Sequence, residues 1–281
     1  MASNIKTIDF KSSKAPEKFV NSLIDTGFAV IRNHSIDFKL IDNVYEQWKQ
    51  FFDSKDKYDY MFDLEKQDGY FPMKSENAKG YSVKDIKEFY HIYLPWGRIP
   101  PHLSKDTLLI RKKLKDIATI LLSWINDLTP DEIKVNFSIP LYEMIDKSET
   151  NLLRILHYPP LRKDDDINAL RAAAHEDINL ITILLSGSKP GLQVKNSDNN
   201  WIDVKSDYGS LIVNIGDMLQ ECSKGYYPST SHRVINPKDE KSNQSRFSMP
   251  FFLHPRDEIR LSDKYTAKEY LDERLKQLGL R

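Results

Sequence analysis

The chain has 281 residues, enough for one large domain or for a domain with a helical extension. Its 41 basic and 41 acidic residues balance, which argues against nucleic acid or a membrane surface as a partner, and its single cysteine, Cys222, excludes an internal disulfide and fits a reducing cytoplasm. No secretory signal is evident at the amino terminus and no apolar run approaches the roughly 20 residues that span a bilayer, so we expect a soluble, unprocessed, cytoplasmic protein.

Helical periodicity dominates the first half of the chain. Two apolar stripes within residues 15–54 predict two helices, the first ended by Gly27, with a short strand at 28–31 between them. Residues 54–104 are rich in Tyr, Gly, Pro and charge, which predicts an ordered, aromatic-packed connection able to line a pocket. A further helix is predicted over residues 105–128.

After about residue 150 the pattern changes to short apolar runs separated by turns. These runs are NLLRILHY, INLITILL, GLQV, WIDV, SLIVNIGD, SHRVI and RFSMPFFL. Regular short runs of this kind are typical of antiparallel strands in a sandwich or barrel, and a double-sheet jelly roll is a form whose mouth can hold a small molecule. A final amphipathic helix is predicted over residues 266–278.

One short stretch carries the strongest chemical signal. In AAAHEDINLITILL, His175 and Asp177 are two residues apart, so in an extended chain both side chains point to one face and can reach the same ion. His232, in YPSTSHRVINP, falls in another predicted strand and is a reasonable third ligand. Two neutral imidazoles and one carboxylate on one side of an ion suit Fe(II) chemistry with dioxygen, but zinc hydrolases use similar ligands. The residue types therefore predict a metal site and leave the metal open.

A second pair follows in SRFSMPFFLHP. Arg246 and Ser248 stand two apart in a predicted strand, which places a guanidinium and a hydroxyl on one face, while Phe247, Met249 and Phe251 point to the other. A buried Arg is costly unless an anion meets it, and the Arg fork beside a hydroxyl suits a carboxylate. We expect an anionic ligand at this pair; the alternative is a structural Arg that pairs with an acidic side chain.

The chain resembles a known enzyme family in several segments, which occur in the same order: HEDINLITIL, GLQV followed by WIDV, LIVNIGDMLQ, YPSTSHRVINP and SRFSMPFFLHP. They resemble the catalytic domain of the isopenicillin N synthase-like branch of the Fe(II)/2-oxoglutarate-dependent dioxygenases. The amino-terminal FVNSLIDTGFAVIRNHSI resembles the helical region that precedes this domain, so the resemblance covers nearly the whole chain. The His-x-Asp element alone is a weak signal, but its combination with the distal His and the following Arg-x-Ser is specific.

The resemblance implies a mainly β fold with flanking helices, in which a double-stranded β-helix, or distorted jelly roll, follows an N-terminal helical region. Residues 1–104 would form the helical and aromatic region, residues 105–149 the linking helices and residues 150–281 the catalytic domain, all in one compact unit. The resemblance also implies that three residues form the catalytic metal triad for Fe(II), namely His175, Asp177 and His232.

The same resemblance implies a 2-oxoglutarate site. The keto acid would chelate iron, and its far carboxylate would meet Arg246 and Ser248, with Tyr158 matching a tyrosine that often helps to hold it. Leu156 departs from the pattern, since plant members commonly carry Asn there. The connection from His232 to Arg246 also looks longer than in close relatives, and we expect a polar loop to absorb the added length.

Other residues attract attention without a clear role. Arg171 could meet an acidic substrate or cosubstrate, but we expect a solvated loop residue, and Gln220 could line the pocket. Cys222 has no base at a suitable spacing, so we do not expect a nucleophile. The remaining histidines are expected to be structural or exposed, namely His34, His91, His102, His157 and His254.

Three functions are compatible with these features. The first is a non-haem iron dioxygenase that uses O2 and 2-oxoglutarate to hydroxylate, desaturate or cyclise a small metabolite, with release of succinate and CO2. The second is an isopenicillin N synthase-like oxidase that uses no keto acid; we expect this less, because the chain ends at Arg281 directly after a predicted helix, without a tail of the kind that reaches the metal in that oxidase. The third is a non-catalytic binding protein of the same fold, against which the complete ligand set argues.

Overall fold

The computed structural model describes residues 5–75, 84–163, 165–166, 169–187 and 189–277. The described elements are, in chain order, β1 Thr7–Asp9, α1 Ala15–Thr26, β2 Phe28–Arg32, α2 Phe38–Asp53, a 3-10 helix at Asp56–Tyr60, β3 Gly69–Phe71, β4 Glu88–Ile92, α3 Pro101–Leu128, α4 Asp131–Lys134, α5 Leu141–Met144, β5 Leu152–Tyr158, β6 Ala172–His175, β7 Ile181–Leu185, β8 Leu192–Lys195, β9 Trp201–Asp203, β10 Leu211–Ile215, α6 Asp217–Cys222, β11 His232–Val234, β12 Arg246–Leu253 and α7 Ala267–Gln277.

Local sequence explains where the amino-terminal helices begin and end. Gly27 follows α1 in the left-handed conformation with φ of 71°, and its N–H donates to the carbonyl of Leu23, which closes the helix as the sequence predicts. The side chain of Asp37 accepts a hydrogen bond from the N–H of Lys39 and so caps α2. The short strand predicted between these helices is β2.

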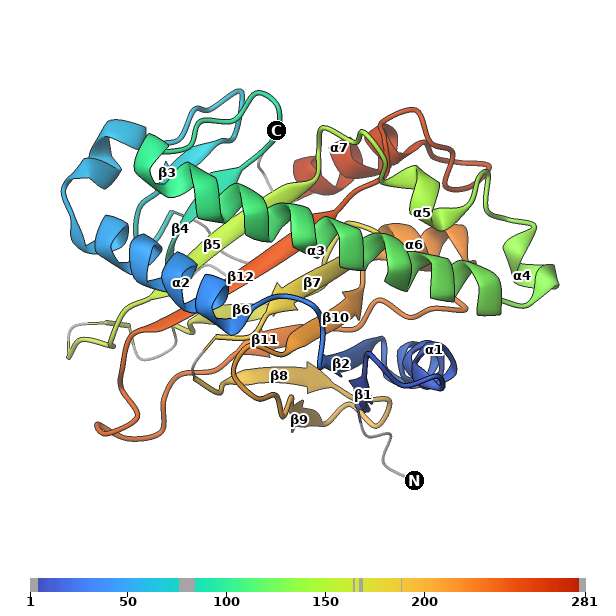
Figure 1. The fold of residues 1–281 in the computed structure, drawn as a ribbon, viewed down its shortest axis with the longest axis horizontal. Coiled ribbons are helices and arrows are strands. Elements are labelled where there is room, and N and C mark those ends of the chain that lie inside the picture. Colours follow the sequence, from blue (N-terminus) through green and yellow to red (C-terminus); the bar gives the residue numbers. More distant parts are fainter. Residues whose placement is uncertain (1–4, 76–83, 164, 167–168, 188, 278–281) are drawn as a thin grey trace.

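Two facing sheets form the centre of the molecule. Within the described residues, the larger sheet has eight strands in the order β1-β2-β10-β7-β12-β5-β4-β3, and the smaller has four in the order β6-β11-β8-β9. Figure 1 shows α2 and α3 lying across the outer face of the larger sheet. One apolar cluster packs the helices onto this sheet, and a second joins residues of both sheets. This arrangement confirms the predicted jelly roll with an N-terminal helical region.

The amino-terminal half contributes more strands than the sequence predicts. Strands β3 and β4, inside the 54–104 connection, pair with each other and extend the larger sheet through β5, and β1 adds an edge strand beside β2. Part of that connection, residues 76–83, lies outside the described residues. The final helix matches its prediction as α7, with residue 278 also outside the described chain. Among the described helices, none is long and apolar enough to cross a membrane.

Alternate side chains of strand β12 face opposite sides of the larger sheet. Met249 and Phe251 belong to the cluster under the helices and Phe247 packs against it, as the alternation predicts. Arg246 and Ser248 take the opposite face and are both buried. Tyr158 and Leu156, their partners on the adjacent strand β5, belong to the apolar cluster between the sheets. Arg246 and Ser248 therefore face the region between the two sheets.

Candidate active site

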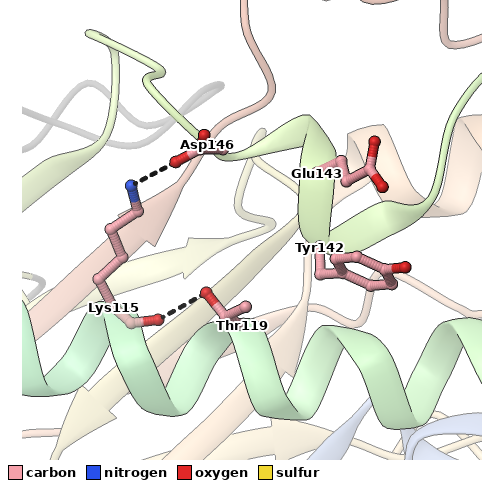
Figure 2. A pocket seen from close by; sticks show the side chains of 5 residues that line it. All are labelled: Lys115, Thr119, Tyr142, Glu143 and Asp146. Atoms are coloured by element: carbon pink, nitrogen blue, oxygen red, sulfur yellow. Dashed lines mark hydrogen bonds and ion pairs between the residues drawn. The ribbon is translucent and has the colours of Figure 1, made fainter.

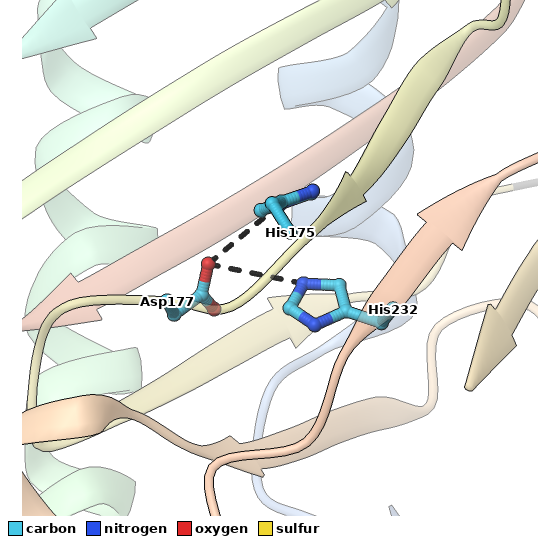
Figure 3. A group of neighbouring side chains, drawn as sticks. All are labelled: His175, Asp177 and His232. Atoms are coloured by element: carbon cyan, nitrogen blue, oxygen red, sulfur yellow. Dashed lines mark ion pairs between the residues drawn. The ribbon is translucent and has the colours of Figure 1, made fainter. Parts of the chain in front are cut away.

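The three predicted metal ligands meet at one end of the smaller sheet. His175 is the last residue of β6, Asp177 lies in the loop that follows, and His232 begins β11 directly opposite His175. Asp177 Oδ1 lies 3.9 Å from His175 Nε2 and 3.8 Å from His232 Nε2 (Figure 3). The ligand atoms lie within 4.8 Å of one another, and this is the one such group of His, Cys, Asp or Glu among the described residues. One ion can therefore contact all three.

Backbone contacts orient both imidazole rings. His175 Nδ1 lies 2.8 Å from the carbonyl of Ala173, and His232 Nδ1 lies 3.1 Å from that of Thr230. A carbonyl only accepts, so each Nδ1 carries the hydrogen and each Nε2 keeps its lone pair for a metal. Partial desolvation, followed by the charge of His232, lowers the pKa of His175. The ring is thus held in the neutral form that binds metal.

Two polar side chains hold the carboxylate of Asp177. Its Oδ2 accepts hydrogen bonds from Thr182 Oγ1 at 2.5 Å and from Asn214 Nδ2 at 2.8 Å, which leaves Oδ1 facing the histidines. Burial alone would raise the pKa of Asp177, but the two histidines and the hydrogen bonds from Thr182 and Asn214 lower it below the usual value. The carboxylate is therefore ionised, and its Oδ1 is oriented toward the two histidines, as a metal ligand requires.

The site contains features that the sequence analysis did not identify. Thr182 and Asn214 are polar residues within the otherwise apolar strands β7 and β10, and they lie opposite each other in register. A polar residue within an apolar run of the sequence was the signal that could have identified each of them. The loop that carries Asp177 is also packed tightly, since a Cβ on Gly216 would overlap the carbonyl oxygen of Asn179.

The donor set fits Fe(II). Two imidazole nitrogens and one carboxylate oxygen are the facial ligands of non-haem iron oxygenases, and the remaining positions around an ion are free for small molecules. The two hydrogen-bonded rings and the doubly hydrogen-bonded carboxylate supply the outer contacts that such ligands need.

A buried cationic cluster, formed by Arg246, Ser248 and Tyr158, borders the apolar residues between the sheets. Arg246 pairs in register with Tyr158 and its guanidinium carbon lies 5.2 Å from the centre of the tyrosine ring. Arg246 Nη1 donates to Ser248 Oγ at 3.3 Å, and Nε donates to the carbonyl of Lys189 at 3.2 Å. Leu156, at the position where plant members carry Asn, lies opposite Ser248 and adds an apolar wall.

Arg246 lacks a carboxylate partner in the described chain. The residue is 4% exposed, and the hydrogen bonds of its side chain go to a hydroxyl and a backbone carbonyl, both neutral. A buried guanidinium without a counter-charge is costly. The alternative of a structural ion pair therefore finds no support here, and the cluster of Arg246, Ser248 and Tyr158 fits an anionic ligand.

Two further expectations can be compared with the structure. Arg171 is not a solvated loop residue: the residue is buried, with 3% exposure, because the connection from β11 to β12 covers it. Gln220 lies on α6, where its Oε1 accepts the N–H of Ser229 at 2.7 Å. That contact shapes the segment before His232. The connection from His232 to Arg246 is a polar loop with a turn in which the N–H of Ser242 donates to Asp239.

The remaining histidines have structural contacts or are exposed. His157 lies 2.7 Å from Glu88 Oε1 and 2.7 Å from Ser245 Oγ, and His34 contacts the carbonyl of Gly209. His102 is exposed on α3. None of the five belongs to the metal-spaced group.

The helical layer carries a separate surface hollow. Figure 2 shows this hollow, of about 220 Å³, lined by Lys115 and Thr119 of α3 together with Tyr142, Glu143 and Asp146. Lys115 Nζ lies 3.3 Å from Asp146 Oδ1 across it. The hollow contains none of the triad residues, so it is not part of the candidate active site.

Two family models match the chain. The model of the 2OG-Fe(II) oxygenase superfamily matches residues 149–255, which include the triad and the cationic cluster. The model described as the N-terminal region of the non-haem dioxygenases in morphine synthesis matches residues 5–108. The two matches together cover both halves of the fold.

Solved structures and a curated relative agree. The crystal structure of a candidate oxygenase from Shewanella oneidensis is 52% identical, covers 99% of this chain and 100% of its own, and superposes with a TM-score of 0.90. That of a candidate 2OG-Fe(II) oxygenase family protein from Caulobacter crescentus is 30% identical over 99% of both chains, with a TM-score of 0.80. The 2-oxoglutarate-Fe(II) type oxidoreductase hxnY of Emericella nidulans is 32% identical over 61% of this chain, which spans 43% of that relative. The chain therefore belongs to the 2-oxoglutarate and Fe(II)-dependent oxygenase superfamily.

Proposed function

We propose that the protein hydroxylates a small metabolite, with Fe(II) held by His175, Asp177 and His232 and with the far carboxylate of 2-oxoglutarate held by the cationic cluster. One observation carries this proposal: the metal-spaced triad and the buried guanidinium of Arg246, which has no carboxylate partner among the described residues, both border the apolar cluster between the two sheets. His232 packs against Phe28 and Arg246 against Tyr158, and both aromatic residues belong to that cluster. A ligand that chelates a metal at one end and carries a carboxylate at the other matches both.

The protein's own groups have separate tasks in this reaction. When bound, Fe(II) and 2-oxoglutarate supply the oxidation, in which O2 and the keto acid give succinate, CO2 and one oxygen atom for the substrate. The backbone contacts of the histidines and the hydrogen bonds of Asp177 keep the ligand atoms in place. Arg246 and Ser248 orient the keto acid through its far end.

The apolar walls between the sheets exclude water. The cluster there includes Phe28, Phe71 and Phe89 from the larger sheet and Val194 and Val234 from the smaller one. Such walls strengthen the charge interactions inside and protect a reactive oxidant from side reactions. They also favour a small substrate that fits between packed side chains.

We also propose a domain organisation and a cellular location for this activity. Residues 150–281 would act as the catalytic domain, with residues 1–104 and 105–149 completing one unit, since β1 to β4 join the same sheet as β5, β7, β10 and β12. The sole, buried Cys222 and the balanced charge support a cytoplasmic location without nucleic acid or membrane partners.

An anaerobic titration tests the proposal. The Fe(II)-loaded protein is titrated with 2-oxoglutarate, and a visible charge-transfer band that saturates is expected when the keto acid chelates ferrous iron. His232→Ala should abolish the band with the fold retained, whereas His102→Ala, at an exposed histidine of α3, should leave it unchanged. Arg246→Ala should shift the titration to higher keto acid concentration.

Either result is informative. If iron is bound and no band forms, the keto-acid-free oxidase becomes the better assignment, with Arg246 and Ser248 holding a substrate carboxylate instead. If His232→Ala retains the band, the assigned triad is wrong.

A further inference from the structure

Arg171 is fixed in place by two distant residues. It directly precedes β6, and its backbone N–H donates to Asn236 Oδ1 at 3.0 Å. Its Nη2 donates to the carbonyl of Gln244 at 2.6 Å, two residues before Arg246. Both acceptors belong to the connection between β11 and β12, so this loop holds Arg171 at its backbone and at its guanidinium.

The charge of Arg171 is buried and incompletely satisfied. The residue is 3% exposed, its Nε is buried without a hydrogen-bond partner, and no carboxylate of the described residues pairs with it. A guanidinium offers five N–H donors, and leaving them unmet in the interior costs more than burying a neutral group. Arg171 therefore has a buried charge and a free donor with which it could bind an anion, and its neighbours decide whether an anion can reach it.

Arg171 belongs to the same region as the cationic cluster. Ala172, the next residue, packs in the cluster between the sheets together with Tyr158 and Leu156. Desolvation lowers the pKa of Arg171, the positive charge of Arg246 lowers it further, and Tyr158 acts in the opposite direction. Two like charges therefore influence each other there, and an anion between them would relieve both desolvation and repulsion.

We propose that Arg171 is a second guanidinium of the cosubstrate site, which binds the far carboxylate of 2-oxoglutarate together with Arg246. The inference rests on the proposed function and extends it. A carboxylate has two oxygens and about four acceptor sites, enough for Arg246, Ser248 and the free Nε of Arg171. The second cation would make the site selective for keto acids with a far carboxylate.

A comparison of two keto acids tests this role apart from turnover. Anaerobic Fe(II)-loaded protein is titrated with 2-oxoglutarate and with 2-oxopentanoate, which has the same chain length and a methyl group in place of the far carboxylate. Arg171→Gln should lower the affinity for 2-oxoglutarate by about tenfold to hundredfold, the range of a charge-assisted hydrogen bond. It should change the affinity for 2-oxopentanoate by less than about twofold. Arg171→Lys should recover part of the loss because it restores the charge.

Arg111 offers a matched control. It is also buried, also has a buried Nε without a partner, and also donates to a backbone carbonyl, that of Asn151. It lies on α3, in the layer outside the larger sheet. Arg111→Gln should lower the stability to unfolding and leave the affinities for both keto acids unchanged.

The outcomes separate the possibilities. If Arg171→Gln loses affinity equally for both keto acids, Arg171 only supports the fold. If its affinity for 2-oxoglutarate is unchanged, Arg171 meets another ligand. Either result overturns the inference. If Arg171→Gln does not fold, the ratio of the two affinities is measured in Arg171→Met, whose side chain keeps the length and lacks the charge; an unchanged ratio in that variant also overturns the inference. If wild-type protein with bound iron gives no band with either acid, the proposed function has failed and the inference fails with it.

Discussion

Thr182 tests how the protein tunes its metal site without touching the metal. Its hydroxyl donates to Asp177 Oδ2 at 2.5 Å, and Asn214 supplies the other hydrogen bond to the same oxygen at 2.8 Å. Thr182→Val keeps the shape of the side chain and removes only the hydroxyl. The substitution therefore isolates one outer contact of a metal ligand.

The expected magnitude follows from these contacts. Loss of a hydrogen-bonded partner behind a metal ligand typically costs about tenfold to hundredfold in metal affinity. Since Asn214 still holds Oδ2, the stability should fall by only about 1–2 kcal/mol. The hydrogen bond from Thr182 helps to lower the pKa of Asp177, so its removal raises that pKa. Protons then compete better with the metal, and the loss of affinity should grow as the pH falls.

The assay is an anaerobic Fe(II) titration at several pH values, with thermal unfolding measured in parallel. Thr107→Val is the control, because Thr107 is a buried threonine of α3 that accepts a hydrogen bond from Trp48 Nε1 at 3.0 Å. That variant should lose stability and keep its affinity for Fe(II). Wild-type iron affinity in Thr182→Val would refute the reasoning that the hydroxyl positions the carboxylate.

Two further predictions concern stability. Removal of metal with a chelator should lower the melting temperature, and metal at 100 times its dissociation constant should restore about 2.7 kcal/mol, or roughly 5 °C, by thermal unfolding; an equal shift in His232→Ala would place the metal elsewhere. Hydrogen bonds from His157, Tyr70 and Lys57 outweigh burial and lower the pKa of Glu88 below its usual value of 4.5. The ionised Glu88 therefore stabilises the fold above about pH 4.5, and this contribution is lost as the pH falls through the lowered pKa. Glu88→Gln should flatten the pH dependence of the free energy of unfolding, measured with denaturant. An identical pH profile in the variant would contradict that assignment.

The local pattern was sufficient for most elements and for the faces of β12. Alternation in RFSMPFFL predicted that Arg246 and Ser248 share one face, and Met249 and Phe251 indeed pack under the helices. Helical stripes predicted α1, α2 and α3 because each must bury one apolar side against the sheet. The His-x-Asp spacing predicted that His175 and Asp177 reach one ion, and the family resemblance supplied His232 as the third ligand.

Strand β6 shows where that pattern failed. Its sequence, AAAH, contains no β-branched or aromatic residue, so its local preference for a strand is low. It forms a strand because β11 pairs with it, which also places His175 opposite His232. The strands β3 and β4 were missed for a related reason, since they are short and lie in a segment rich in turn-forming residues.

The sequence by itself determined the residue types, their spacing and the face that each strand presents, because these depend on neighbours a few positions away. The tertiary structure decided the burial of Arg171, whose two anchors, Asn236 and Gln244, are 65 and 73 residues away. It likewise decided that Thr182 and Asn214 meet Asp177. A local pattern shows where a side chain points, but burial depends on which distant segment covers it, and that is settled only when the whole chain packs.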